Sequence, residues 1–409
     1  MAKQAVTIVI VISKGSGDVS PDTVVAGVPL LRRIVMAASR AGSDEIVVMD
    51  TGWPGLARLI AGTRAGLLSP AQLADLPMRN RTQTDRPYPS RILVLTSNLL
   101  PHPSLLTYLT EMPLHIETMH VPIDGIAAVE TADPQVILSM IGRADDDRLL
   151  FSALERTYQK AGAPMDNTRC VRVLNREDLC SAERWLLRGL IKDTEGFMSK
   201  HVERKISLAV TRRLVDTDIT PNQMTAVSVA IGVLGALFFF STMPAYQLTG
   251  ALLFLLHSIL DGCDGEIARL KYLESRLGGI LDFWGDNAVH SAVFMCIGLG
   301  WQMAIKASFP LVLAASAVIG TLLSAGFVYR QTMRNKTDEG PLFTSVTTSE
   351  APSRLSTIAD TLARRDFIYL VVILSAFGKA HWFLVLAAFG SPIFFFVLLW
   401  TSHRERVKA

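Results

Sequence analysis

This sequence has few cysteines, and its acidic and basic residues are nearly equal in number. Its 409 residues include only Cys170, Cys180, Cys263 and Cys296, whose spacing matches neither a zinc site nor a disulfide framework. The formal net charge is +3, and no run of Lys and Arg is interleaved with aromatic residues. We therefore expect reduced, mostly structural cysteines and no nucleic-acid partner.

The opening residues lack the pattern of a cleavable leader. The apolar run Val6–Ile12 is short and has no small-residue cleavage site after it. It leads into Gly15 and Gly17 as a buried strand leads into a turn. We therefore expect the N-terminal half to be cytosolic.

Charge is unevenly distributed along the chain. Up to about Leu190, charge, proline and short apolar runs are mixed as in a soluble α/β domain. From Thr225 onward, several nearly uncharged stretches have the length of membrane spans. The two halves are therefore predicted to fold in different solvents.

Apolar β-branched runs alternate with amphipathic stretches over residues 1–185. Strands are predicted at Val6–Ile12, Glu45–Met49 and Arg91–Thr96, and helices at Val28–Ala41 and Ser104–Thr110. This alternation predicts an α/β domain with a parallel sheet and helices on its faces.

A basic amphipathic segment follows this domain. Residues Ala182–Val215 carry Arg and Lys at helical spacing, with Phe197, Ile206 and Leu208 between them. Such a pattern is typical of a helix lying on the cytosolic surface of a membrane. We assign residues 186–218 to this interfacial helix and linker.

Residues 219–409 predict an all-α polytopic membrane domain of about six transmembrane helices. The spans are expected at Met224–Phe240, Leu248–Ile267, Gly278–Gly300, Phe309–Val328, Phe367–Ala380 extending to about Leu384, and Val385–Trp400. Between the fourth and fifth spans, the polar segment Gln331–Arg365 is predicted to be a loop with a short helix near Leu355–Ala363.

Basic residues mark one side of these spans. They include Arg213 before the first span, Arg276 before the third and Arg404 after the last, whereas the opposite loops hold only Lys306 and Lys379. Lys and Arg collect in cytosolic loops. We therefore expect a multi-pass protein of the cell (inner) membrane, with both termini and the N-terminal domain in the cytosol.

Acidic residues gather on the second and third predicted spans. Asp261 and Asp264 are three residues apart, and Asp282 and Asp286 are four apart, so each helix presents two carboxylates on one face. Both pairs lie at nearly equal residue counts from a turn near Tyr272–Glu274. This symmetry predicts that the four carboxylates converge at one depth.

Such a cluster requires positive charge. An ionised aspartate in a membrane helix costs on the order of 2.5 to 3.5 kcal/mol, and bound cations are the natural compensation. All-oxygen ligands without a nearby His or Cys ligand favour Mg²⁺ or Mn²⁺ and also admit Ca²⁺. Four carboxylates suffice for a two-metal site, which suits phosphoryl chemistry.

Small residues and one arginine accompany the aspartates. Gly265, Ala268 and Gly278 remove side-chain bulk where the helices meet, which close helix packing alone would explain. The guanidinium of Arg269 can hold a phosphate with two hydrogen bonds. Together these residues could open a slot for a nucleotide diphosphate.

The full pattern resembles a family signature. The order D-x-x-D-G-x-x-A-R, eight residues, then G-x-x-x-D-x-x-x-D is complete from Asp261 to Asp286. It resembles the signature of the CDP-alcohol phosphotransferases. The resemblance covers roughly Ala182 to the C-terminus and includes a T-P-N-x-x-T segment, Thr220 to Thr225.

This resemblance implies a mechanism. Asp261, Asp264 and Asp282 would bind the metals that grip the donor diphosphate, and Asp286 would deprotonate the acceptor hydroxyl and also contact a metal. The hydroxyl oxygen would attack the β-phosphorus of the CDP-alcohol and release CMP. The implied CDP-binding residues are Asn222, Thr225, Asp261, Gly265, Ala268, Arg269 and Gly278.

The implied partners are a CDP-linked lipid such as CDP-diacylglycerol, a polar alcohol acceptor, membrane lipids and a second copy of the chain. The residues that hold the acceptor are left unassigned. Other interpretations stay open: ion pairs within the bundle, a divalent-cation transporter, or a transferase joining a soluble CDP-polyol to a polyol phosphate. Transport would need polar residues across the bilayer, whereas the outer halves of the spans are apolar.

The first half resembles the start of a sugar-phosphate nucleotidyltransferase, with a Rossmann-like sheet, over Val6–Gly17 and Val25–Leu31. Two features of that family are missing: a basic residue after the glycine loop, where Asp18 stands, and a lysine between Asp18 and Val28. Carboxylates are also missing from Thr96–Asn98 and Val173–Asn175. Because a lost metal ligand removes metal-assisted transfer, we expect an inactive domain that serves as a scaffold or binding module.

The fusion of these two parts resembles bifunctional inositol-phosphate cytidylyltransferase and di-inositol phosphate synthase proteins. The resemblance makes an inositol phosphate, or another polyol phosphate, the expected acceptor.

Overall fold

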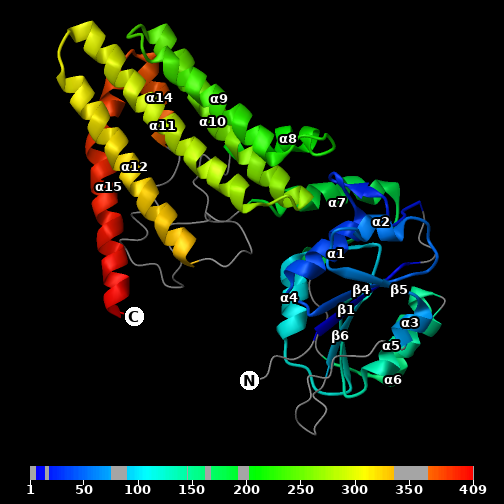
Figure 1. Cartoon of the computed structure of the whole chain (residues 1–409). Coiled ribbons are helices and arrows are strands. Elements are labelled where there is room, and N and C mark those ends of the chain that lie inside the picture. The colour runs from blue at the N-terminus through cyan, green and yellow to red at the C-terminus, as the bar shows by residue number, and fades with distance from the viewer. Residues whose placement is uncertain are drawn as a thin grey trace. The chain divides into compact units, whose positions relative to one another are not determined.

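The computed structural model describes residues 6–13, 18–74, 90–144, 146–161, 167–191, 202–335 and 367–408. The contacts within it divide the chain into two compact units, Met1–Arg188 and Gly189–Ala409 (Figure 1). The division of the chain at residues 186 and 219 that the sequence suggests stays a prediction.

A seven-stranded sheet forms the centre of the first unit, in the order β10-β8-β9-β6-β1-β4-β5. Its strands are β1 (Val6–Val11), β4 (Glu45–Met49), β5 (Ala65–Leu68), β6 (Ser90–Thr96), β8 (Thr118–Ile123), β9 (Ile126–Thr131) and β10 (Gln159–Lys160). Strand β1 runs parallel to β4 and β6, and all three strands predicted from the sequence are confirmed.

The sheet is parallel as predicted except at β9. This strand runs antiparallel to both β6 and β8. Only Asp124 and Gly125 separate β8 from β9, and Gly125 has a φ of 93°. A two-residue connection can join antiparallel neighbours only, because a parallel crossover needs a dozen or more residues.

Helices cover both faces of this sheet. One hydrophobic cluster contains residues of α1 (Leu30–Arg40), α4 (Pro103–Glu111) and α7 (Arg176–Arg188). The other contains residues of α3 (Pro70–Ala74), α5 (Pro134–Arg143) and α6 (Asp147–Thr157). Strand β1 contributes Ile8 and Ile10 to the first cluster and Val9 and Val11 to the second, as alternation along a strand requires.

Shorter elements complete the first unit. They are β2 (Val24–Val25), β3 (Val28–Pro29), α2 (Leu56–Ile60), β7 (Leu99–Pro101), η1 (Asn167–Arg169) and β11 (Cys170–Arg172). The two predicted helices are confirmed as α1 and α4.

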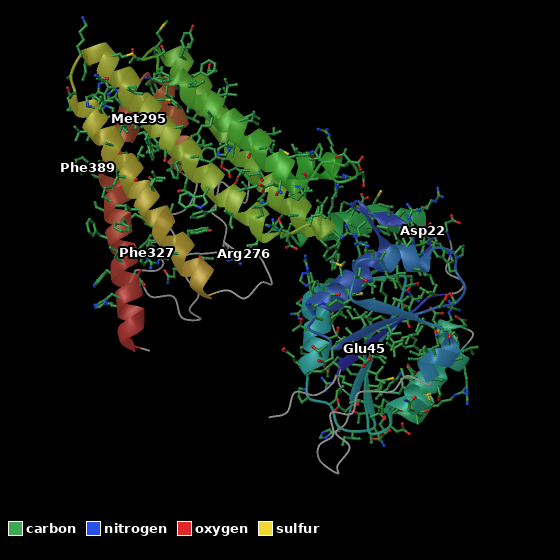
Figure 2. The ribbon with its side chains drawn as sticks, in the orientation of Figure 1. Asp22, Glu45, Arg276, Met295, Phe327 and Phe389 are labelled. Atoms are coloured by element: carbon green, nitrogen blue, oxygen red, sulfur yellow. The ribbon has the colours of Figure 1, made fainter. Side chains whose placement is uncertain are left out.

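The second unit is helical. Its described helices are α8 (Arg204–Leu214), α9 (Pro221–Phe238), α10 (Pro244–Lys271), α11 (Arg276–Ile305), α12 (Phe309–Asn335), α14 (Phe367–Ala376) and α15 (Ala380–Lys408). Apolar side chains such as Met295 on α11 and Phe389 on α15 are 38% and 62% exposed (Figure 2), as expected of surfaces that face lipid.

Four described helices are long and apolar enough to cross a membrane: α9, α11, α12 and α15. The expected count of about six is not confirmed. Helix α14 is apolar but has ten residues. Helix α10 has 28 residues, but its second half carries the charged residues Asp261, Asp264, Glu266 and Arg269. It is therefore not among the helices that are apolar enough to cross a membrane.

Several boundaries differ from the sequence-based expectation. Helix α12 continues to Asn335 into the predicted polar loop, and α15 begins at Ala380 rather than at Val385. The predicted interfacial segment contains two helices, because α7 ends at Arg188 and α8 begins at Arg204. The short helix expected near residues 355–363 lies outside the described residues.

Candidate metal and nucleotide site

Local sequence sets the helix ends that surround the aspartates. Helix α9 starts with a capping box in which Thr220 and Gln223 bond reciprocally, with Pro221 at the first helical position. Tyr272, whose φ is 57°, caps the C-terminus of α10, and Ser275 caps the N-terminus of α11 with its side chain accepting the Gly278 N–H. The predicted turn between α10 and α11 is therefore confirmed.

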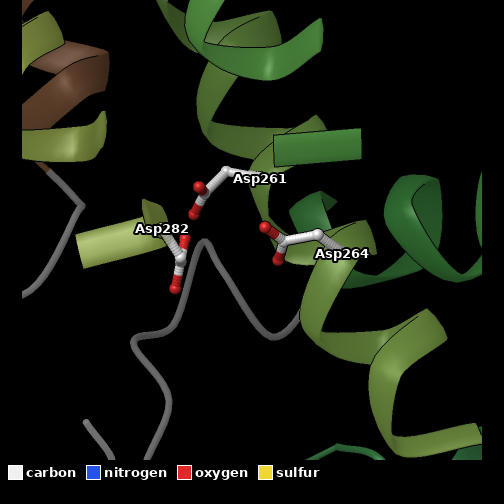
Figure 3. A group of neighbouring side chains, drawn as sticks. All are labelled: Asp261, Asp264 and Asp282. Atoms are coloured by element: carbon white, nitrogen blue, oxygen red, sulfur yellow. The ribbon is translucent and has the colours of Figure 1, made fainter. Parts of the chain in front are cut away.

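Three aspartates from two helices meet in the second unit. Asp261 and Asp264 on α10 and Asp282 on α11 each offer a carboxylate oxygen, and these oxygens all lie within 4.8 Å of one another. Figure 3 shows the three carboxylates directed toward one another. Asp261 is 4% exposed and Asp264 is 6% exposed. Buried like charges at this separation repel unless protons or a cation intervene.

The chemistry of these ligands fits a hard divalent cation. All the donors are carboxylate oxygens, which Mg²⁺ and Mn²⁺ prefer. Asp282 Oδ1 is buried and has no hydrogen-bond partner among the described residues. A bound metal ion would therefore satisfy both the charge and the open lone pairs of this cluster.

The start of α9 contacts both acidic helices. The Thr225 hydroxyl donates a hydrogen bond to the Asp264 carboxylate, and Thr225 is 5% exposed. A Cβ added at Gly278 would lie 2.9 Å from Asn222 Oδ1, so Asn222 occupies the space beside that glycine. The T-P-N-x-x-T segment thus lies at the aspartate cluster, with Thr225 orienting one carboxylate.

The proposed nucleotide slot has a second group of residues on α10. A Cβ added at Gly265 would lie 3.0 Å from Arg269 Nη1, so the guanidinium lies over the bare backbone of Gly265. Ala268 is half-buried one turn after Asp264, and its carbonyl oxygen accepts the N–H groups of Tyr272 and Leu273. Any role of these residues in nucleotide binding stays a prediction.

Asp286 lies beside a histidine. Its Oδ1 is 3.5 Å from His257 Nε2, and it is not part of the three-residue group within the described chain. His257 Nδ1 lies 2.9 Å from the Ser228 carbonyl oxygen. Because a carbonyl only accepts, Nδ1 carries a proton and Nε2 is the atom that faces Asp286.

The sequence places His257 close to the aspartates without indicating a role for it. It is 2% exposed and stacks on Phe254, with ring centroids 6.2 Å apart. One signal could have found it: His257 precedes Asp261 by four residues, so both lie on one face of α10.

Comparison with known families agrees with this arrangement. Residues 218–358 match the model of the CDP-alcohol phosphatidyltransferase family. The match spans α9 to α12 and contains every predicted site residue. The second unit of this chain therefore carries a CDP-alcohol phosphatidyltransferase domain, and the resemblance inferred from the sequence is confirmed.

Individual relatives have more specific names than the family. Over 114 residues, 28% of this chain and 25% of the relative, the chain is 44% identical to a bifunctional IPC transferase and DIPP synthase from Thermococcus kodakarensis. It is 40% identical over 156 residues, 38% of this chain and 31% of the relative, to the protein of that name from Archaeoglobus fulgidus. The matched part thus spans about a quarter to a third of these relatives.

The name of a third relative refers to the synthesis of a lipid. The chain is 29% identical over 128 residues, 31% of this chain and 54% of the relative, to phosphatidylinositol phosphate synthase from Mycobacteroides abscessus.

Solved structures resemble each unit only distantly. A Mycobacterium tuberculosis phosphatidylinositol phosphate synthase with CDP-DAG bound matches 48% of this chain and 94% of its own, with 19% identity and a TM-score of 0.33. A nucleotidyl transferase from Methanothermobacter matches 45% of this chain and 98% of its own, with 16% identity and a TM-score of 0.34. Neither score is high enough to support a functional conclusion.

Proposed function

We propose that the protein transfers a phosphoalcohol group from a CDP-alcohol to a hydroxyl of a polar acceptor and releases CMP. One observation carries this proposal: Asp261, Asp264 and Asp282 bring carboxylate oxygens within 4.8 Å of one another inside a CDP-alcohol phosphatidyltransferase domain. Bound divalent cations would supply charge to stabilise the diphosphate and the leaving CMP.

The chain's own residues would perform the remaining steps. Asp286 removes the proton from the acceptor hydroxyl, and the oxygen attacks the β-phosphorus of the donor. The new P–O bond forms while the bond from that phosphorus to the CMP oxygen breaks. Arg269 holds phosphate oxygens over Gly265, and Thr225 holds Asp264 in its metal-binding orientation.

The names of the relatives guide the choice of substrates. CDP-diacylglycerol is the proposed donor, and an inositol phosphate or another polyol phosphate is the proposed acceptor. The transfer would take place at the cytosolic side of the membrane, with both termini and the first unit in the cytosol. A homodimer stays a prediction from the family resemblance.

The first unit is proposed to bind or scaffold rather than to transfer nucleotides. The end of β6 offers Thr96, Ser97 and Asn98 in place of a carboxylate. Purified protein incubated with labelled CTP and sugar phosphates would release pyrophosphate if this proposal is wrong.

Product analysis tests the central proposal. Purified protein would be incubated with CDP-diacylglycerol, Mg²⁺ and a pool of polar alcohols that includes inositol phosphate, and products would be identified by mass spectrometry. We expect one CMP for each lipid product. Asp286→Asn should fold normally yet lose transfer, whereas the exposed matched variant Asp216→Asn should retain it.

Two results would redirect the assignment. Metal-dependent cation flux in liposomes without CMP release would favour a transporter. CMP release only with a soluble CDP-polyol would favour transfer between soluble polyols, with the membrane as housing.

A further inference from the structure

Helix α8 packs against α10 through polar residues. Ser207 and Thr211, spaced four apart, are 2% and 0% exposed. On the same helix, Ile206 is 43% exposed. A helix that buries polar side chains needs partners for them, because an unpaired buried polar group is costly.

The partner is Glu266 on α10, which is 0% exposed. Its Oε1 accepts hydrogen bonds from Arg204 Nη1 and Ser207 Oγ, both at 2.7 Å, and its Oε2 accepts one from Thr211 Oγ1 at 2.6 Å. Both carboxylate oxygens are thus satisfied by three residues of α8. Hydrogen-bond networks of this kind favour one arrangement of two helices, because removal of one member leaves the other buried groups without partners.

This arrangement brings a second arginine to the nucleotide face of α10. A Cβ added at Gly262 would lie 3.5 Å from Arg204 Nη1, and one added at Gly265 would lie 3.0 Å from Arg269 Nη1. Gly262 and Gly265 are three residues apart and therefore share a face of the helix. Two guanidinium groups thus lie along one side of α10.

We propose that Glu266 is a positioning residue that fixes α8 on α10 and thereby places Arg204 beside Arg269 at the edge of the nucleotide slot. Two guanidinium groups repel each other but suit a ligand with two adjacent phosphates. Binding of the CDP diphosphate then depends on the docking of α8. This inference rests on the proposed function, because the slot is assigned through it.

Cys263 provides a probe of docking that does not depend on activity. Its side chain is 0% exposed, and its Sγ lies 3.5 Å from the Ser207 carbonyl oxygen of α8. In a full-length background carrying Cys170→Ser, Cys180→Ser and Cys296→Ser, the rate of maleimide labelling of Cys263 reports whether α8 covers it. Glu266→Gln should increase that rate at least tenfold, and the milder Thr211→Val should increase it less.

Calorimetric titration with CDP and Mg²⁺ then links docking to the slot. Glu266→Gln and Arg204→Ala should each weaken CDP binding about tenfold, a typical effect of losing an outer-shell partner. The KM of the acceptor should stay unchanged. Lys205→Ala removes the same charge from an exposed position of α8 and should leave CDP binding unchanged.

The outcomes separate this inference from the proposed function. Faster labelling of Cys263 with unchanged CDP affinity would overturn it, as would unchanged labelling in Glu266→Gln. If the wild-type protein binds CDP but releases no CMP from any CDP-alcohol, the proposed function is wrong. The role of Glu266 would then still be tested by the CDP titration.

Discussion

Buried charges are balanced differently in the two units. In the first unit, Glu130 is 4% exposed and lies 2.8 Å from Arg91 Nη2, which in turn is 3% exposed. In the second unit, the carboxylates of Asp261, Asp264 and Asp282 are nearest to one another. The buried charge of Glu130 is thus neutralised by Arg91, whereas the aspartate cluster needs protons or a bound cation to relieve its repulsion.

The same contrast exists within one helix. On α10, Glu266 is satisfied by three donors of α8, whereas two residues earlier Asp264 accepts from Thr225 and faces two other acids. A carboxylate with a full set of donors holds structure together, and a cluster of carboxylates without one is suited to bind a cation. This difference distinguishes structural acids from candidate metal ligands in this unit better than burial alone.

Removal of a clustered carboxylate should have the largest effect. Asp282→Asn should lower CMP release at least about 1,000-fold, equivalent to about 4 kcal/mol in the barrier, because it weakens metal binding at the diphosphate. Mn²⁺ binding measured by electron paramagnetic resonance should weaken in parallel. If this variant kept its metal binding and its activity, the proposed difference between the buried carboxylates of the two units would be wrong.

Removal of a paired carboxylate should instead cost stability. Glu130→Gln leaves Arg91 buried without its counter-ion and should destabilise the first unit by about 3 kcal/mol. Hydrogen exchange of the β6 and β9 amides would measure this change. The matched control is Glu155→Gln, because Glu155 pairs with Lys160 at 2.8 Å while both are exposed, and such pairs contribute less than about 1 kcal/mol.

A smaller effect is expected from loss of the hydrogen bond between Thr225 and Asp264, a proposed metal ligand. Thr225→Val keeps the shape of the side chain but removes the hydrogen bond to Asp264, and it should weaken Mn²⁺ binding about tenfold. Thr249→Val on α10 removes a hydroxyl that bonds only the local Ala245 carbonyl and is the control. Equal effects of the two substitutions would argue against an orienting role for Thr225.

The smallest effect concerns the buried Asp147 of the first unit. Burial raises the pKa of Asp147, an effect that the hydrogen bond from Ser13 opposes. A raised carboxyl pKa stabilises the fold below the unfolded value and loses that contribution as pH rises through the folded value. Asp147→Asn should therefore slightly stabilise this unit at neutral pH, by less than about 1 kcal/mol, with no gain below about pH 3.

Denaturant melts of full-length protein at both pH values would measure this small shift. A loss of stability at neutral pH would mean that the Ser13 hydrogen bond outweighs the cost of burying the carboxylate.

Much of the site was predictable because it is local. The spacing of Asp261 and Asp264 places both on one face of any helix, and the turn at Tyr272 returns Asp282 to the same level. The capping box at Thr220 likewise follows from neighbouring residues. The antiparallel β9 was not predicted, because strand direction follows from which strands pair in the sheet.

Sequence alone identified the aspartates that we propose as metal ligands and predicted that α10 and α11 bring them together. Only the tertiary structure decided that Asp286 lies against His257 and that Glu266 is held by α8. The physical reason is that helical periodicity sets directions within one helix, whereas contacts between helices depend on how each one is rotated and packed against the next.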